Sequence, residues 1–189
     1  MTDHSPIVHT ACYAGSFDPP TYGHLDVISR ARRMFDRVVL GVGTNPSKHT
    51  LFSGDERVDL LNELVAQMVK ETPGHAPVHV ERFTGLTVDF ATETGATVLI
   101  RGIRNLNDLT GELQQAITNQ HLAGIETVFV GAGSDFSYVS STLIRQVTAM
   151  GNDLSILEPM CPRLVIEALA AKKSERPEAI REIIDRASG

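Results

Sequence analysis

The 189-residue sequence has few cysteines and no long apolar run, and these absences narrow its class. Cys12 and Cys161 lie far apart and form no CxxC pair, so we expect neither a structural disulfide nor a zinc site. No apolar stretch is long enough to cross a bilayer, and the first ten residues lack the features of a secretory signal. The sequence therefore predicts a cytoplasmic protein that does not contact membranes.

Positive charge is also scarce, with 17 Lys and Arg against 23 Asp and Glu and a net charge of −6. This balance gives no support to binding along nucleic acid, although a local basic pocket can bind one anionic ligand. Gly41 and Gly43 lack the third glycine of a dinucleotide-binding fingerprint. Pro77 prevents a regular helix between His75 and His79, so we expect no metal held by a cluster of side chains. No catalytic-triad spacing is present either.

Short apolar runs alternate with helical patterns along most of the chain. The expected strands are Ile7 to Tyr13, Arg37 to Gly43, Val78 to Arg82, Thr97 to Arg101 and Glu126 to Gly131. Ser53 and Glu56 form a capping-box start for one of the helices between them. This alternation predicts an α/β fold, a single-domain doubly wound (Rossmann-like) five-stranded parallel sheet with flanking helices. The domain is expected over residues 1–171, followed by a charged C-terminal helix or tail over 172–189.

The stretch GSFDPPTYGH, from Gly15 to His24, is the most informative loop. It joins the first expected strand to the first helix, which is the kind of turn that cradles phosphates. His24 falls in the first helical turn, where free N–H groups and the helix dipole favour an anion and an imidazole can donate to it. The alternative is a Gly/Pro connection with a capping residue.

Three more loops reach the same rim, because ligands of doubly wound sheets bind beyond the carboxyl ends of the strands. Lys48 in the second loop can reach a phosphate as a mobile charge, or can be a solvated loop charge. Arg101 and Arg104 follow the apolar run VLI and suit phosphate oxygens. Their alternative role is to pair with Asp108 or Glu112.

The loop after the fifth strand carries hydroxyls at the start of a helix. Ser140, Ser141 and Thr142 lie there, with Arg145 one turn later. Hydroxyls and free N–H groups at this point form a second anion site, and the alternative is that the serines only cap the helix.

Four motifs in order, GSFDPPTYGH, NPSK, LIRGIR and YVSSTLIR, resemble bacterial phosphopantetheine adenylyltransferases. These enzymes belong to the nucleotidyltransferase superfamily with a T/HxGH motif, and the match runs from about Val8 to Ala171. The resemblance implies transfer of the adenylyl group of ATP to 4′-phosphopantetheine, giving dephospho-coenzyme A and pyrophosphate with Mg²⁺ carried on ATP. It also implies feedback binding of coenzyme A and a homohexamer.

The resemblance also implies roles for individual residues. Ser16, Lys48 and Arg101 would bind the pantetheine phosphate, with Thr87 lining the pantetheine arm. His24 would stabilise the transition state, with Lys48 and Arg101 as further catalytic residues. The ATP set would be Ser16, Phe17, His24, Gly102, Ile103, Arg104, Glu112, Phe136, Ser137, Tyr138, Val139, Ser140, Ser141 and Thr142. In DLTGE, Gly111 departs from the family pattern DFEYE and removes an aromatic ring beside the nucleotide.

The side chains in these motifs are sufficient for adenylyl transfer. The nucleophile is already a phosphate anion, so alignment and charge stabilisation suffice without a strong general base. Two other functions stay open at this point. One is another nucleotidyltransferase, such as nicotinate-mononucleotide adenylyltransferase, and the other is a non-catalytic nucleotide-binding regulator.

Overall fold

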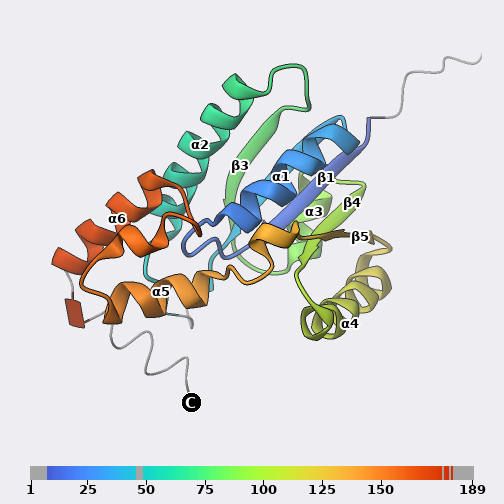
Figure 1. The fold of residues 1–189 in the computed structure, drawn as a ribbon. Helices are drawn as coiled ribbons and strands as arrows, with labels where there is room; N and C mark the ends of the chain where they lie inside the picture. Colours follow the sequence, from blue (N-terminus) through green and yellow to red (C-terminus); the bar gives the residue numbers. More distant parts are fainter. Residues whose placement is uncertain (1–7, 46–48, 176, 179, 181–189) are drawn as a thin grey trace, which may run out of the picture.

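The fold is a five-stranded parallel sheet flanked by helices (Figure 1), seen in a computed structural model that describes residues 8–45, 49–175, 177–178 and 180. The strand order is β3-β2-β1-β4-β5, and every neighbouring pair is parallel. The strands are β1 (Thr10–Gly15), β2 (Arg37–Gly43), β3 (Val78–Phe83), β4 (Val98–Ile103) and β5 (Glu126–Gly131). The structure confirms the predicted fold class.

Two strand boundaries differ from the prediction in ways that matter for the site. β1 begins at Thr10 and continues to Gly15, beyond the predicted end at Tyr13. β4 continues to Ile103, so Arg101 lies inside the strand and not at its end. In both cases the backbone pairing with neighbouring strands continues past the predicted end, through Ala14 and Gly15 in β1 and through Gly102 and Ile103 in β4.

Helices cover both faces of the sheet. On one face, α1 (Tyr22–Met34) and α2 (Gly54–Glu71) bury a core with β1, β2 and β4, formed by Ala11, Tyr13, Val27, Ile28, Ala31, Val38, Leu40, Leu61, Val65 and Ile100. On the other face, α3 (Thr87–Glu93) and α4 (Leu106–Ala123) pack, with a core formed by Cys12, Ala14, Val39, Val88, Phe90, Ala91, Leu99 and Ile125. The predicted capping box of Ser53 and Glu56 starts α2.

The C-terminal third adds a separate layer beside α2 (Figure 1). It consists of η1 (Ser134–Phe136), α5 (Ser141–Met150), η2 (Leu154–Leu157) and α6 (Arg163–Glu175). Helix α6 continues past residue 171, the position where the sequence predicted the change from domain to tail. Lys172 Nζ, just beyond this position, lies 2.5 Å from Glu56 Oε1 on α2. Lys173 donates to the Gly151 carbonyl, and Ile180 is buried. Among the described residues, none of the helices has the length and apolarity that a bilayer span requires.

The strand order places the topological switch point between β1 and β4. The chain runs outward from β1 through β2 to β3, then returns to β4 on the other side of β1. Loops leaving β1 and β4 therefore diverge and open a crevice at the carboxyl ends of these two strands. The functional site is expected in this crevice.

Candidate active site

Two cavities lie at the switch point and meet at Ala14, Gly15 and Arg101. The first has a volume of about 290 Å³ and is lined by Tyr13, Ala14, Gly15, Thr21, Gly23, His24, Val27, Arg101, Gly102, Arg104, Asp108, Glu112, Ala132, Val139, Ser140, Ser141 and Thr142. The second has a volume of about 230 Å³ and is lined by Ala14, Gly15, Ser16, Gly43, Thr44, Asn45, Thr50, Phe83, Gly85, Thr87 and Arg101. The site is therefore built for two ligands, or two parts of one ligand, that meet beside Arg101.

The motif Thr21-Tyr22-Gly23-His24 folds as a capping box at the start of α1. The His24 backbone N–H donates to Thr21 Oγ1 at 3.3 Å, and the Thr21 backbone N–H donates to His24 Nδ1 at 3.0 Å. Histidine here takes the part that glutamate or glutamine usually takes three residues after the N-cap. The bond to Nδ1 fixes the imidazole, and the bond from the backbone N–H fixes the first turn, where the sequence predicted His24 to lie.

This hydrogen bond also determines the tautomer of His24. A backbone N–H can only donate, so Nδ1 must accept and carries no proton. Burial, together with the nearby Arg104 guanidinium, lowers the pKa of the imidazole to about 4, so the ring is neutral at pH 7. A neutral ring with a bare Nδ1 carries its proton on Nε2. Because His24 lines the first cavity, it offers a neutral N–H donor to a ligand there.

The buried ring of Phe17 packs against the imidazole of His24. Its side chain is 1% exposed, and its ring centroid lies 5.0 Å from that of His24 and 5.4 Å from that of Tyr13. Phe17 has φ of 49°, an uncommon left-handed conformation for a residue with a side chain. The buried ring contacts compensate for this backbone conformation, which indicates that the loop is shaped to place Phe17 under the imidazole.

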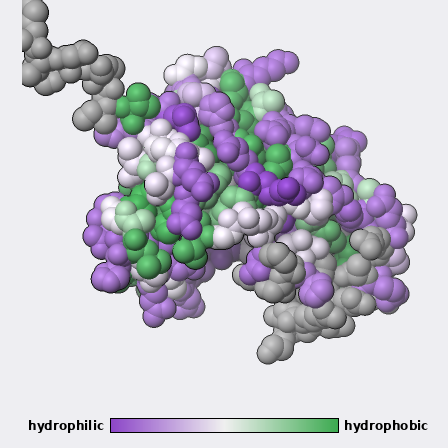
Figure 2. Space-filling model, turned by 180° about the vertical axis from the view of Figure 1, so that it is seen from behind, coloured by the Kyte–Doolittle hydropathy of each residue, from purple (hydrophilic) through white to green (hydrophobic). Residues whose placement is uncertain are grey.

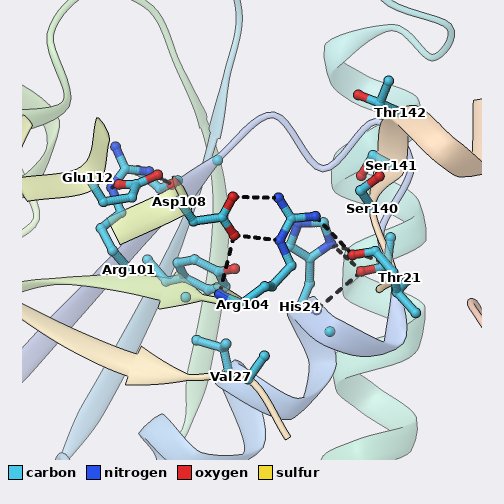
Figure 3. Close-up of a pocket in the computed structure, with 17 residues that line it drawn as sticks. Thr21, His24, Val27, Arg101, Arg104, Asp108, Glu112, Ser140, Ser141 and Thr142 are labelled. Carbon is cyan, nitrogen blue, oxygen red and sulfur yellow. Dashed lines mark hydrogen bonds and ion pairs between the residues drawn. The ribbon is translucent and has the colours of Figure 1, made fainter. Parts of the chain in front are cut away.

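Two arginines line the first cavity, and each lies beside a carboxylate of α4 (Figure 3). Arg104 binds Asp108 through two hydrogen bonds of 2.8 and 3.1 Å, and its third contact is the Val139 carbonyl at 3.0 Å. Arg101 Nε lies 3.2 Å from Glu112 Oε2, in an ion pair that lacks hydrogen-bond geometry. Both arginines therefore make the carboxylate pairs that the sequence allowed and also line the cavity.

Arg101 connects the two cavities. Its Nη1 donates to the Ala14 carbonyl at 2.8 Å and its Nη2 to Gln115 Oε1 at 2.9 Å. These contacts hold the guanidinium between β1 and α4, where the cavities meet. A permanent positive charge at this point can contact anionic groups from either side.

A fully buried arginine, Arg57 on α2, organises the loops around the second cavity. Its Nη1 donates to the Ser16 carbonyl at 2.6 Å and to the Gly43 carbonyl at 3.0 Å, and its Nε donates to the Ser53 carbonyl at 3.2 Å. It therefore ties the ends of β1 and β2 to the start of α2. No sequence pattern indicates this role of Arg57, because an arginine in an amphipathic helix is normally exposed.

Asp18 adds a second tie between the same loops. Its carboxylate accepts from the backbone N–H groups of Leu51 and Phe52 at 2.8 and 2.9 Å. Arg145 on α5 donates to the Asp18 carbonyl, so the first loop is held both by the segment before α2 and by α5. The sequence pattern indicates no role for Asp18, and only its burial shows one.

The serine hydroxyls at the start of α5 make different hydrogen bonds. Ser140 caps the helix by accepting from the Leu143 N–H at 3.1 Å, as the capping alternative predicted. Ser141 donates to the Pro19 carbonyl at 2.7 Å, which joins α5 to the first loop. Both serines and Thr142 line the first cavity, so capping and exposure to a ligand coexist.

Some of the remaining predicted site residues line a cavity and others do not. Ser16 and Thr87 line the second cavity, and Gly102, Glu112 and Val139 line the first. The following do not line either cavity: Phe17, Ile103, Phe136, Ser137 and Tyr138. Phe136 instead packs against Tyr22, with ring centroids 5.9 Å apart. Lys48 lies outside the described residues.

Gly111 is on the exposed side of α4, and a Cβ built there meets nothing within 4 Å.

Within the described part of the chain, no group of three or more His, Cys, Asp or Glu side chains is arranged to hold a metal ion. The carboxylates at the first cavity, Asp108 and Glu112, face arginines.

Residues 12–147 match the protein family described as cytidylyltransferase-like. Among curated proteins, the chain is 42% identical over 174 residues to a phosphopantetheine adenylyltransferase of Rhodopirellula baltica, covering 90% of this chain and 93% of that protein. It is 43% identical over 145 residues to a phosphopantetheine adenylyltransferase of Nocardioides sp., covering 77% of this chain and 87% of that protein.

Among solved structures, the fold resembles nicotinic acid mononucleotide adenylyltransferase of Plasmodium falciparum, with a TM-score of 0.63 and 13% identity. That match covers 88% of this chain and 97% of the other. A bifunctional NMN adenylyltransferase/ADP ribose pyrophosphatase of Francisella tularensis gives a TM-score of 0.60 at 13% identity, covering 96% and 53% of the two chains. These likenesses show a shared fold. From the extent and identity of the sequence matches, the chain belongs to the phosphopantetheine adenylyltransferase family of cytidylyltransferase-like nucleotidyltransferases.

Proposed function

We propose that the protein transfers the adenylyl group of ATP to 4′-phosphopantetheine, giving dephospho-coenzyme A and pyrophosphate. The observation that carries this function is the junction of two cavities beside Arg101, with the His24 donor lining the first of them. The first cavity suits ATP and the second suits the phosphopantetheine arm. Family membership supports this choice of substrates, since the sequence relatives carry this name.

The reaction requires alignment more than proton transfer. A phosphate oxygen of phosphopantetheine attacks the α-phosphorus of ATP, and the bond from that phosphorus to the bridging oxygen of pyrophosphate breaks. The nucleophile is already anionic, so no residue needs to remove a proton. Arg101 would hold the phosphopantetheine phosphate at the junction, while Arg104 and the α5 hydroxyls would hold ATP. Ser16 and Thr87 would contact the acceptor in the second cavity.

His24 would stabilise charge on the α-phosphate during transfer. The capping-box bond to Nδ1 and the packing against Phe17 fix the imidazole, so the Nε2–H donor is oriented before the substrates arrive. Preorganised donors of this kind contribute most where charge develops in the transition state. Removal of one such donor typically lowers the rate by about 10²–10³-fold.

Magnesium fits this site as an ion carried on the ATP phosphates. Mg²⁺ keeps several waters and usually takes only one or two protein carboxylates beside substrate phosphates. Asp108 and Glu112 line the first cavity but pair with Arg104 and Arg101, so the ATP phosphates and water would hold the ion. When bound, the ion would neutralise charge on the leaving pyrophosphate.

The acceptor assignment is tested by pyrophosphate release from MgATP with 4′-phosphopantetheine or nicotinate mononucleotide. We expect release only with 4′-phosphopantetheine. His24→Ala should lower kcat about a hundredfold or more with little change in ATP affinity, since the donor serves the transition state. His121→Ala, an exposed histidine on α4, is the matched control and should keep full activity.

Two results would contradict the proposal. Equal or greater turnover with nicotinate mononucleotide would reassign the acceptor, and near-normal kcat in His24→Ala would remove His24 from the mechanism. Binding of ATP without turnover on any acceptor would favour a nucleotide-binding regulator.

We also propose that the protein assembles as a homohexamer, is inhibited by coenzyme A and is located in the cytoplasm. Apolar side chains of α4 and β5 gather on one exposed surface, visible at the left in Figure 2, namely Leu106, Leu113, Ile117, Leu122 and Val128. This surface supports packing of copies into a homohexamer, which sedimentation measures. Coenzyme A combines the chemical parts of both substrates, so it would occupy the joined cavities as a feedback inhibitor that competes with ATP. A cytoplasmic location completes the proposal, and cell fractionation tests it.

A further inference from the structure

Tyr13 has a hydroxyl that no residue around it uses. The side chain lies on β1, is 7% exposed and lines the first cavity. Within the described residues, the Tyr13 hydroxyl makes no hydrogen bond, although the neighbouring side chains and loop carbonyls are extensively paired. Among the described residues, the buried side-chain atoms without a partner are Arg37 Nε, Glu112 Oε2 and Thr127 Oγ1, so the Tyr13 hydroxyl is not sealed in the core but is accessible where the ring lines the cavity.

The phenol ring is fixed by its neighbours. Phe17 packs edge-on against it with centroids 5.4 Å apart, and the His24 ring centroid lies 6.3 Å away. These contacts need only an aromatic ring, which phenylalanine would provide equally well. The packing therefore explains the ring of Tyr13 and leaves the hydroxyl unexplained.

The hydroxyl lies at the wall of the first cavity, next to β4. Tyr13 Oη is 3.6 Å from the position that a Cβ would take on Gly102, and the same Cβ would lie 3.0 Å from Val27 Cγ2. Gly102 and Val27 both line this cavity. Glycine thus leaves the space beside the hydroxyl open on the side from which a ligand would approach.

Burial raises the pKa of the Tyr13 phenol well above its usual value, with Arg101 and Arg104 opposing the shift. The hydroxyl is therefore protonated throughout the neutral range and can donate a hydrogen bond. Tyr13 does not line the second cavity, so it is placed to meet the ligand of the first cavity only.

We propose that the Tyr13 hydroxyl donates a hydrogen bond to the adenine nucleotide in the first cavity and so contributes to ATP binding, separately from phosphopantetheine binding. This inference rests on the proposed function for the identity of that nucleotide. It adds to the site a neutral donor on the central strand, beside the arginines and the α5 hydroxyls.

Calorimetric titration of Tyr13→Phe tests the inference, with MgATP and 4′-phosphopantetheine titrated separately. The variant keeps the ring and removes one neutral donor, so the Kd for ATP should rise roughly three- to tenfold. The Kd for 4′-phosphopantetheine and the melting temperature should stay at the wild-type values. Tyr22→Phe is the matched control, because Tyr22 lines neither cavity and also keeps its ring, and it should change neither Kd.

Wild-type ATP affinity in Tyr13→Phe would overturn the inference. A lower melting temperature with equal weakening of both ligands would also overturn it, because that pattern indicates a structural role. The proposed function is judged separately, by turnover of the wild-type protein. Wild-type protein that binds ATP but does not adenylylate 4′-phosphopantetheine would disprove the function while still allowing the Tyr13 comparison.

Discussion

Acidification distinguishes a neutral His24 donor from an ordinary histidine. With a pKa of about 4, only about one imidazole in a thousand is protonated at pH 7. The difference of this pKa from the ordinary histidine value of 6.5 corresponds to about 3 kcal/mol. The unfolded chain binds this proton more readily than the folded chain, so the contribution to stability is present above pH 6.5 and is lost as pH falls toward 4.

The assay is nitrogen-15 NMR of the free protein, labelled on histidine, between pH 5 and 8. We expect the His24 signals to show a bare Nδ1 and a protonated Nε2, without a titration step between pH 6 and 7. His24→Gln identifies the signals by removing them, and the chain unfolded in urea supplies the reference with a pKa of about 6.5.

Activity alone would not decide the question. Phosphate monoesters lose their second proton near pH 6, so a limb in the rate profile can come from the substrates. A His24 signal that titrates between pH 6 and 7 would refute the argument from burial. A neutral ring with its proton on Nδ1 would refute the tautomer deduced from the Thr21 N–H.

Two further substitutions test the framework around the site, both through the free energy of unfolding in urea. Arg57→Met removes three side-chain hydrogen bonds to backbone carbonyls and should lose about 3 kcal/mol, whereas Arg57→Lys should lose less because its ammonium can still reach a carbonyl. Equal losses in both variants would show that packing, and not the hydrogen bonds, matters at this position. Gly111→Ala should gain about 0.5–1 kcal/mol, because the added Cβ meets nothing and alanine is the better helix former. A loss of stability there would contradict the assigned exposure of this helical face.

Local patterns in the sequence were sufficient for the elements and for several of their caps. Alternating apolar runs gave the parallel sheet, and the capping box of Ser53 and Glu56 and the cap at Ser140 were read from residues within one helical turn. The placement of His24 in the first turn of α1 was predictable for the same reason. Each of these features depends on hydrogen bonds between residues close together in the chain.

The contacts that give the site its chemistry join residues distant in the chain. Arg57 is buried because the carbonyls of Ser16 and Gly43 converge on it from two other loops. Arg101 lies inside β4 and not after it, because β-pairing with β5 continues beyond the apolar run. The sequence by itself determined which segments form strands and helices and which polar residues reach the rim. Only the tertiary structure decided the neutral state of His24, the unused hydroxyl of Tyr13 and the two cavities that meet at Arg101, because burial and the geometry of converging loops depend on the packed chain.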